Sequence, residues 1–354
     1  MTTESPPRSL ASRTVSAPGK LVVAGEYAVL AGHEALVAGV SKRARASIVD
    51  DDEPFRVGGM GLGPFVVEHA REGGVVLQGD TKDSLALLRS VLDAALARGV
   101  ALPRTGSISV GSRAFLSRAR GVKLGLGSSA AAAVALAGAL VSDDDGDVTD
   151  RARVFEIALA GHLAFSGGRG SGIDVAASTM GGLARFRRDA GGPHIAEGPR
   201  VPRALSVVVA FAGHAQNTRT FVDAVRALSE RDPSAHTGCI DAIAAATKDV
   251  LSSCERHEDV AFLRAIDACR HAMHALGERA GIDIVSAPHA EIARLTSTCG
   301  GAAKPSGAGG GDVALAFVPH STRALLEARL AEAGFAVVDL KLFSPGVRVD
   351  RPRA

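Results

Sequence analysis

The chain has 354 residues and a formal net charge of +2 at pH 7, so its bulk charge gives no reason to expect nucleic acid or a membrane surface as a partner. Hydrophobic residues make up 46% of the chain, with no Trp and one Tyr, which predicts a core of aliphatic side chains and Phe in about two domains. No apolar run approaches the roughly 20 residues that span a bilayer. Residues 1–13 are polar and lack the apolar stretch of a signal peptide, so we expect a cytoplasmic protein with a disordered leader over residues 1–13.

Four cysteines lie in the second half of the chain, at positions 239, 254, 269 and 299. None belongs to the close Cys-x-x-Cys spacing that is typical of zinc sites and redox disulfides. This pattern favours reduced, mostly buried thiols.

Hydrophobic alternation predicts strands in the first part of the chain. Residues 14–30 should form a strand, a turn at Pro18 and Gly19, and a second strand that starts with Lys20. Two further strand regions are expected at residues 35–49 and 65–77. An acidic, glycine-rich loop at residues 50–63 should connect them. Apolar residues at helical spacing then predict a helix over 84–97, followed by a strand over 106–110.

The stretch from Lys123 to Ala130 reads Lys-Leu-Gly-Leu-Gly-Ser-Ser-Ala and runs into an alanine-rich helix that ends near residue 140. Gly125 and Gly127 allow the backbone to turn and to approach a ligand closely. A helix that starts in this way aims free N–H groups and its positive end at one point, which suits a phosphate. The alternative that these residues leave open is a small-residue helix packed tightly in a core.

An acidic stretch, residues 142–150, contains four aspartates. It lacks the regular ligand spacing of a calcium loop, so a solvated loop is the better prediction. A helix over 151–165 then runs into a second glycine turn, residues 166–172, and a further helix with Asp174 near its start. An aspartate in that position is often only a helix cap.

The second half of the chain begins after a strand at 181–188 and a stretch at 189–202, whose glycines and prolines predict the domain boundary. Beyond it, the pattern predicts strands at 205–211, 313–318 and 336–340, and helices at 213–228, 239–276, 287–298 and 323–333. Residues 300–312 form a third glycine turn, Gly-Gly-Ala-Ala-Lys-Pro-Ser-Gly-Ala-Gly-Gly-Gly-Asp.

Three glycine turns, each flanked by strong secondary structure, are hard to explain by packing alone. The chain contains no Walker loop, which needs Gly-Lys-Ser/Thr four residues after a glycine. Gly125-Leu126-Gly127 is not followed by the third glycine of a dinucleotide-binding turn. Together the three turns predict a site in which backbone surrounds a polyanion from several sides.

In these turns the chain resembles the GHMP kinases, a family of small-molecule kinases with three signature motifs. The motifs are seen here, in order, as Ala17-Pro18-Gly19-Lys20 with Gly25-Glu26-Tyr27-Ala28-Val29, as Gly125-Leu126-Gly127-Ser128-Ser129-Ala130-Ala131, and as Lys304-Pro305-Ser306-Gly307-Ala308-Gly309-Gly310-Gly311-Asp312. The resemblance implies an α+β, two-domain GHMP kinase fold. It implies an N-terminal ATP-binding domain similar to ribosomal protein S5 domain 2 over residues 14–195, and a ferredoxin-like C-terminal domain over residues 196–354.

Within the family, the chain looks most like the phosphomevalonate kinase subfamily. The stretch from Lys304 to Asp312 matches the form of that subfamily, and the spacing from His162 to Asp174 matches as well. Mevalonate kinases usually have a magnesium-binding Glu in the region where this chain offers His162. One departure is Asn217, which replaces a Ser implicated in holding the substrate phosphate, although Asn can still donate a hydrogen bond to phosphate.

This resemblance implies ATP-dependent phosphorylation of (R)-5-phosphomevalonate to (R)-5-diphosphomevalonate, in the mevalonate route to isoprenoids. The enzyme alternatives are mevalonate kinase and another GHMP small-molecule kinase. An alternative of a different class is a catalytically silent, ligand-sensing protein with the same fold.

The resemblance also implies roles for individual residues. Asp174 would act as a base or orient the nucleophile, and Lys20 would pair with Asp174 and with the acceptor oxygen. Ser129 would hold Mg²⁺. The residues implied to bind ATP are Lys123, Gly125, Leu126, Gly127, Ser128, Ser129 and Ala130. The residues implied on the substrate side are Lys20, Glu26, Arg169, Ser171, Asp174, Asn217 and Gly309.

Three histidines near these motifs, His33, His162 and His214, are expected to be structural. The partner that the resemblance implies is a small phosphorylated molecule, and the protein is expected to be a monomer or a homodimer.

Overall fold

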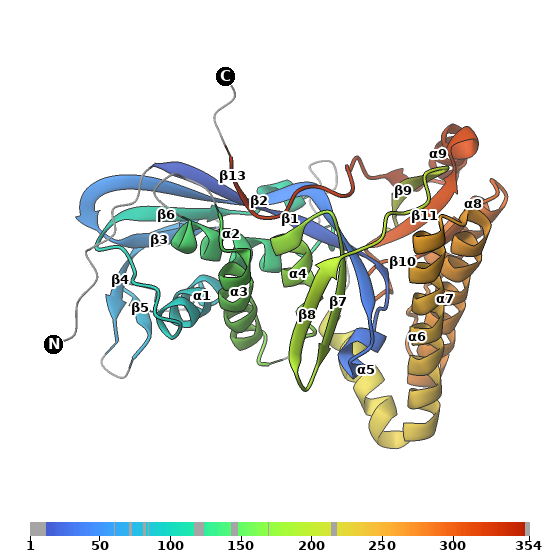
Figure 1. The fold of residues 1–354 in the computed structure, drawn as a ribbon, viewed down its shortest axis with the longest axis horizontal. Helices are drawn as coiled ribbons and strands as arrows, with labels where there is room; N and C mark the ends of the chain where they lie inside the picture. The colour runs from blue at the N-terminus through green and yellow to red at the C-terminus, as the bar shows by residue number, and fades with distance from the viewer. Residues whose placement is uncertain are drawn as a thin grey trace.

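The computed structural model describes residues 12–59, 61–70, 73–80, 83, 85–116, 124–142, 148–168, 170–213 and 218–350. These residues form two β-sheets, one of nine strands and one of four, with helices packed against both (Figure 1). The α+β class expected from the sequence is therefore confirmed.

The nine-stranded sheet has the strand order β13-β1-β2-β6-β3-β4-β5, with β7 paired to β2 and β8 to β7. Its strands are β1 (Arg13–Ala24), β2 (Ala35–Pro54), β3 (Arg56–Gly59), β4 (Leu62–His69), β5 (Val75–Leu77), β6 (Thr105–Gly111), β7 (Leu183–Asp189), β8 (Gly192–Glu197) and β13 (Arg348–Asp350). Four helices lie on one side of the sheet in Figure 1: α1 (Ala86–Leu96), α2 (Ser128–Val141), α3 (Arg151–Phe165) and α4 (Ile173–Met180). Helices α2 and α4 contact β1 and β2 directly, so the first turns of both lie close to the longest strands.

Several predicted elements differ in this sheet. Strand β1 continues through Pro18 and Gly19, because a register shift between these two residues absorbs the irregularity. The second strand expected from Lys20 onward is present only to Ala24, as the continuation of β1. A short 3-10 helix, Ala28–Ala31, then follows positive φ angles at Gly25 and Tyr27.

Two expected loops also contain strands. Strand β2 is a single element that runs to Pro54, and β3 follows directly, so the predicted loop at 50–63 is largely strand. The predicted boundary stretch at 189–202 contains β8, which pairs with β7 as a hairpin.

The four-stranded sheet has the order β10-β11-β9-β12 and is antiparallel throughout. Its strands are β9 (Leu205–Phe211), β10 (Ala302–Pro305), β11 (Val313–Pro319) and β12 (Ala336–Val337). The helices of this half are α5 (Thr218–Arg231), α6 (Pro233–Arg256), α7 (Asp259–Ala280), α8 (Ala287–Ser297) and α9 (Arg323–Glu332). The rings of Phe262 on α7 and Phe317 on β11 meet edge to face at 4.9 Å, which locks helix to sheet.

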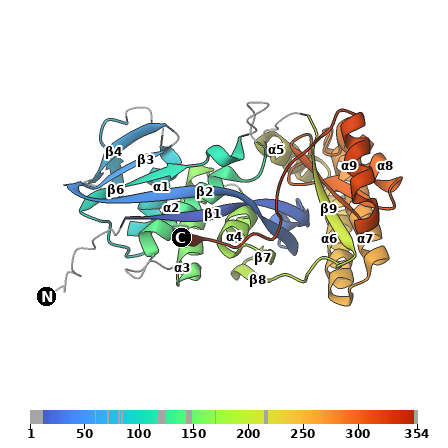
Figure 2. The same cartoon turned by 90° about the horizontal axis from the view of Figure 1, so that it is seen from above.

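The chain ends by returning to the first sheet. After β12 it leaves the four-stranded sheet and runs along β1 and α4, where β13 pairs with β1 (Figure 2). The domain boundary between residues 195 and 196 stays a prediction. Strand β13 follows that boundary in the sequence but belongs to the first sheet. Residues 1–11 of the expected leader, which covers residues 1–13, lie outside the described part of the chain. Arg13 is already the first residue of β1.

Two expectations from composition concern the state of the cysteines and the absence of membrane-spanning segments. All four cysteines are free thiols, and three of them are buried, as expected. None of the helices in the described part of the chain is long and apolar enough to cross a bilayer.

Candidate active site

A cavity of about 320 Å³ lies between the two halves of the molecule. It is bounded by the C-terminal part of β1, the first turns of α2, α4 and α5, and the third glycine turn. Several residues singled out from the sequence line it together: Lys20, Glu26, Ser129, Ser171, Asp174 and Gly307.

Lys20 connects the first and the third glycine turns. Its backbone N–H donates to Leu126 O at 2.9 Å, which joins β1 to the first turn. A Cβ atom at Gly127 would lie 2.9 Å from Lys20 Cγ, and one at Gly307 would lie 3.4 Å from Lys20 Nζ. The lysine side chain therefore runs between the first and third turns. Gly127 leaves it room, and Gly307 is favoured by its positive φ of 89°.

The third turn is fixed to the rest of the site by two further contacts. Ser306 Oγ accepts from Val22 N at 2.9 Å and donates to Val22 O at 3.1 Å. The Asp312 carboxyl group fills the space beside Gly125, since a Cβ atom there would lie 2.3 Å from Asp312 Cγ. These contacts hold segments that are nearly 300 residues apart in the sequence in one place.

Glu26 forms a buried ion pair with Lys304 at 2.5 Å, and the side chains are 3% and 0% exposed. Lys304 Nζ also donates to Pro305 O, and Glu26 Oε1 accepts from Gly307 N at 3.4 Å. Glu26 Oε2 is buried and has no hydrogen-bond partner in the part of the chain that the structure describes. Breaking such a pair from one side is costly, at roughly 3–5 kcal/mol, so Glu26 has a structural role whatever it does toward substrate.

Helix α2 begins without a capping side chain. Gly127 at its N-cap has φ 73°, and among the described residues no capping side chain bonds to the first turn. Ser128 and Ser129 are partly exposed, whereas every residue from Ala130 to Leu140 is buried. The body of the helix is thus packed on all sides, and its first turn retains the free N–H groups that suit an anion.

His162 on α3 lies against the start of α2. Its Nε2 atom is 3.2 Å from Ser129 Oγ, and the ring lines the cavity. Burial lowers the pKa of His162, and the nearby Asp174 carboxylate acts in the opposite direction. His162 was expected to be structural, and the structure instead places it in the cavity beside Ser129.

Asp174 is the second residue of α4, and its side chain does not cap the helix. The N-cap is Gly172, with φ 89°, and the Ser171 hydroxyl accepts from Ile173 N at 3.3 Å. Asp174 therefore faces the cavity rather than the backbone. In the described part of the chain no ion pair joins it to Lys20, although both line the same cavity.

The donor set suits a metal that arrives with a nucleotide better than a metal held by protein alone. Within the described ranges, no group of three or more His, Cys, Asp or Glu side chains is arranged to hold an ion. Mg²⁺ is commonly bound through one or two protein oxygens together with phosphates and water. Ser129 and Asp174 both present oxygen to the cavity, so these two residues fit such an ion, whereas the His162 nitrogen does so poorly.

The remaining site predictions are distributed as follows. Lys123, Arg169 and Asn217 lie outside the described residues, as do the aspartates at 143–147. Gly309 packs against the carbonyl of Ile284, where a Cβ atom would lie 2.2 Å from the oxygen, and it does not line the cavity. Residues of the cavity wall that the sequence did not suggest are Tyr27, His162, Thr218, Arg219 and Asp223.

The first half of the chain matches a known family model. Residues 94–182, which include the second glycine turn and α4, match the model for the N-terminal domain of GHMP kinases. A mevalonate kinase of Archaeoglobus fulgidus is 30% identical over 265 residues, which cover 71% of this chain and 78% of that protein. The chain belongs to the GHMP kinase family.

Two further relatives of this GHMP kinase carry a different substrate in their names. Phosphomevalonate kinase of Streptomyces sp. (strain CL190) is 27% identical over 336 residues, which cover 85% of this chain and 88% of that protein. The crystal structure of Streptococcus pneumoniae phosphomevalonate kinase in complex with phosphomevalonate and AMPPNP has a TM-score of 0.75 at 19% identity, over 93% of this chain and 99% of that one. At this identity the structural likeness establishes the shared fold.

Proposed function

We propose that this GHMP kinase transfers the terminal phosphate of ATP to (R)-5-phosphomevalonate and so forms (R)-5-diphosphomevalonate, a step in the mevalonate route to isoprenoids. The observation that carries the proposal is a single cavity in which Lys20, Ser129 and Asp174 meet beside the third glycine turn. Phosphoryl transfer needs positioning and charge neutralisation more than covalent chemistry from the protein. The cleft supplies both through Lys20, the Asp174 carboxylate and the N–H groups at the start of α2.

The residues have distinct roles in this proposal. The N–H groups at the start of α2 bind phosphate oxygens, and Ser129 directs its hydroxyl to the same place. Lys20, held between two glycine turns, neutralises charge where the donor and acceptor phosphates meet. Asp174 orients the acceptor oxygen, which in a phosphate monoester is already anionic near neutral pH. Mg²⁺ bound with ATP would supply further neutralisation of the phosphate charge.

One feature supports a phosphorylated acceptor over mevalonate itself. Arg219 and Thr218, in the first turn of α5, line the same cavity as Lys20, with Asp223 one turn later on the same wall. A second phosphate would therefore meet a second cation there. Coverage does not separate the two substrates, because the Streptomyces phosphomevalonate kinase matches over 85% of this chain and the mevalonate kinase of Pyrococcus abyssi over 96%.

Mevalonate kinase is the second candidate, because the relative with 30% identity carries that name. A silent, ligand-sensing protein is a weaker candidate, since Lys20, Ser129 and Asp174 are all retained and line one cavity. A cytoplasmic location and a monomeric or homodimeric state stay predictions.

The experiment that separates these functions is an ADP-release assay with MgATP and four acceptors: phosphomevalonate, mevalonate, homoserine and galactose. We expect kcat/KM for phosphomevalonate to exceed that for each of the others by at least about 100-fold, since a site that binds a charged group rejects analogues lacking it. Preference for mevalonate would replace the proposal with the second candidate. ATP binding by calorimetry without turnover of any acceptor would favour the silent protein.

A further inference from the structure

The C-terminal strap, which we define as residues 338–350, joins the two sheets. At its start, Val338 N donates to Val209 O on β9 at 2.8 Å. Farther along, Lys341 O accepts from Ser41 N on β2, also at 2.8 Å, and β13 at its end pairs with β1. Figure 2 shows this segment running past α4 toward the C-terminus.

The strap lies directly against the end of α4. Val347 N donates to Thr179 O at 3.1 Å, and Gly182 N donates to Ser344 O at 2.8 Å. A Cβ atom at Gly346 would lie 2.1 Å from Thr179 O, so the two backbones touch. Asp174 is only five residues, or about 7.5 Å, away along the same short helix.

The strap also contacts the helix that begins with Ser128 and Ser129. The Val347 side chain is 1% exposed and lies against Gly138 of α2, where a Cβ atom would be 2.8 Å from Val347 Cγ2. The strap therefore supports the far ends of α2 and α4, two of the three helices whose first turns face the cavity. Helix α2 has 14 residues and a wholly buried body, whereas α4 has eight residues, so α4 depends more on this support.

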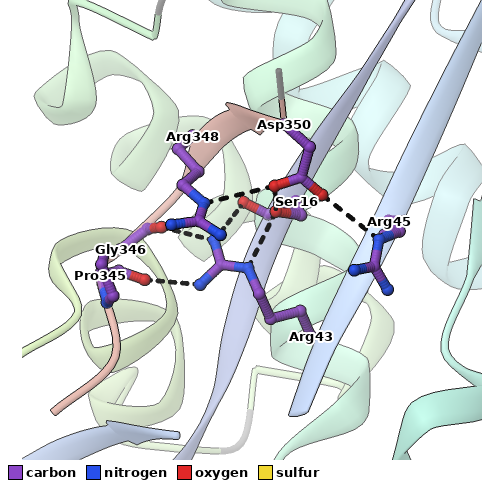
Figure 3. A network of polar contacts seen from close by, with 7 residues as sticks. All are labelled: Ser16, Arg43, Arg45, Pro345, Gly346, Arg348 and Asp350. Carbon is purple, nitrogen blue, oxygen red and sulfur yellow. Dashed lines mark hydrogen bonds and ion pairs between the residues drawn. The ribbon is translucent and has the colours of Figure 1, made fainter. Parts of the chain in front are cut away.

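One buried arginine holds the strap in place (Figure 3). Arg43 on β2 is 7% exposed, and its guanidinium donates to Pro345 O at 2.6 Å and to Gly346 O at 2.7 Å. It also donates to the hydroxyl and the carbonyl oxygen of Ser16 on β1, each at 2.8 Å. Only the planar fork of an arginine can serve these four acceptors at once.

We propose that Arg43 is a positioning residue, which clamps the strap at Pro345 and Gly346 and thereby fixes α4 and the Asp174 carboxylate relative to the cavity. The kinetic part of this inference rests on the role proposed for Asp174 above. Arg43 itself does not line the cavity, so its effect on the reaction is transmitted through backbone contacts.

The test uses the full-length protein with Arg43→Gln and, independently, Gly346→Ala. The first substitution removes the clamp, and the second pushes the strap away from Thr179 without removing any polar partner. Arg45→Gln is the matched control for charge, because Arg45 lies on the same strand and is 55% exposed. Among the described residues it pairs only with the side chain of Asp350, the last residue of the strap, and does not contact Pro345 or Gly346. Gly111→Ala is the control for the glycine change, because a Cβ atom there meets nothing within 4 Å.

Two readouts are compared at a temperature well below unfolding. Hydrogen exchange by mass spectrometry should show amide exchange in residues 173–182 at least about 10-fold faster in both test variants. Because small displacements of a catalytic group cost about 10- to 100-fold in rate, kcat should fall by that factor while KM for ATP changes less than about 3-fold. Both controls should match the wild type in both readouts.

Unchanged exchange in α4 in both test variants would overturn the inference. Faster exchange with unchanged kcat would also overturn it, because α4 would then be held without being positioned for the reaction. Equal losses in the Arg45→Gln control would assign the effect to charge and contradict the clamp. If Arg43→Gln does not fold, Gly346→Ala and Arg43→Lys give the same two readouts. If the wild type phosphorylates no acceptor, the proposed function fails, and the exchange measurement alone decides whether Arg43 holds α4.

Discussion

Helices α2 and α6 begin in opposite ways. Asp232 caps α6, and its carboxylate accepts from Ala235 N at 3.0 Å. Gly127 precedes α2 in a left-handed conformation, and within the described ranges no side chain caps this helix. The first arrangement stabilises a helix on its own, and the second leaves N–H groups for a ligand. Of these two helices, α2 is the one whose first turn faces the cavity, and it is the one without a capping side chain.

The neighbouring helices α3 and α4 repeat this contrast. Asp150 caps α3 by accepting from Arg153 N at 2.9 Å. Gly172 precedes α4 with φ 89°, and the Asp174 carboxylate in the first turn does not cap the helix. Aspartate is thus used for capping at α3 and left free toward the cavity at α4, which separates a structural carboxylate from a functional one.

The most direct test of this contrast replaces Asp174 and Asp150, each by Asn in a separate variant. We expect Asp174→Asn to lower kcat by about 10²- to 10⁴-fold, because the loss of a positioned catalytic carboxylate has effects of this size. ATP affinity measured by calorimetry should stay within a few-fold of wild type. Asp150→Asn is the matched control and should leave both quantities unchanged, because Asn caps a helix as well as Asp does. Turnover like wild type in Asp174→Asn would remove Asp174 from the reaction.

The second test concerns the hydroxyl at the uncapped start of α2. Ser129→Ala should reduce kcat/KM for ATP by roughly 10- to 100-fold, since a hydrogen bond to a charged group contributes about 1.5–3 kcal/mol. Steady-state kinetics at varied Mg²⁺ concentration measures the change. Ser297→Ala is the control, because that hydroxyl donates to Arg294 O on an exposed helix face. Equal kinetics in the two variants would show that Ser129 has no role in binding nucleotide.

The third test separates backbone strain from the contact with Lys20. Gly127 and Gly281 have nearly the same φ, 73° and 70°, but only Gly127 lies against Lys20. Both Gly→Ala variants should lose about 1–2 kcal/mol of unfolding free energy, because a side chain is strained in this conformation. Only Gly127→Ala should also lower kcat/KM, by about 10-fold. Denaturant titration and kinetics together decide this, and an equal kinetic loss in Gly281→Ala would contradict it.

The smallest expected effect is at the capped helix. Asp232→Ala should lower the free energy of unfolding by about 1 kcal/mol, because it leaves N–H groups of α6 without a partner. Kinetic constants should not change, since Asp232 lies far from the cavity lining. A large kinetic effect would mean that α6 is coupled to the site and that its cap is not merely structural.

Local features of the sequence predicted many elements well. Helix α3 and strand β9 have the predicted limits, 151–165 and 205–211, because each has a strong pattern and clear boundary residues. Strands β10 and β13 were not predicted, since a four-residue and a three-residue strand exist only through distant pairing partners. The irregularity at Pro18 and Gly19 was read as a turn, although a bulge can absorb the same residues within a strand.

The candidate site was likewise predictable from the sequence only in part. Motif residues such as Lys20, Ser129 and Asp174 could be named from the sequence, and they line one cavity. The contact between Ser129 and His162 and the pair between Glu26 and Lys304 could not, because they join residues 33 and 278 positions apart. No periodicity or motif spacing encodes such contacts, which arise only when the helices and sheets pack.

The most direct test of the central claim is a crystal structure with Mg²⁺, a non-hydrolysable ATP analogue and phosphomevalonate. We predict that the terminal phosphates lie within hydrogen-bond distance of the backbone N–H groups of Ser128, Ser129 and Ala130, with Lys20 Nζ between donor and acceptor. Phosphates bound away from the start of α2, with Lys20 directed elsewhere, would contradict the account.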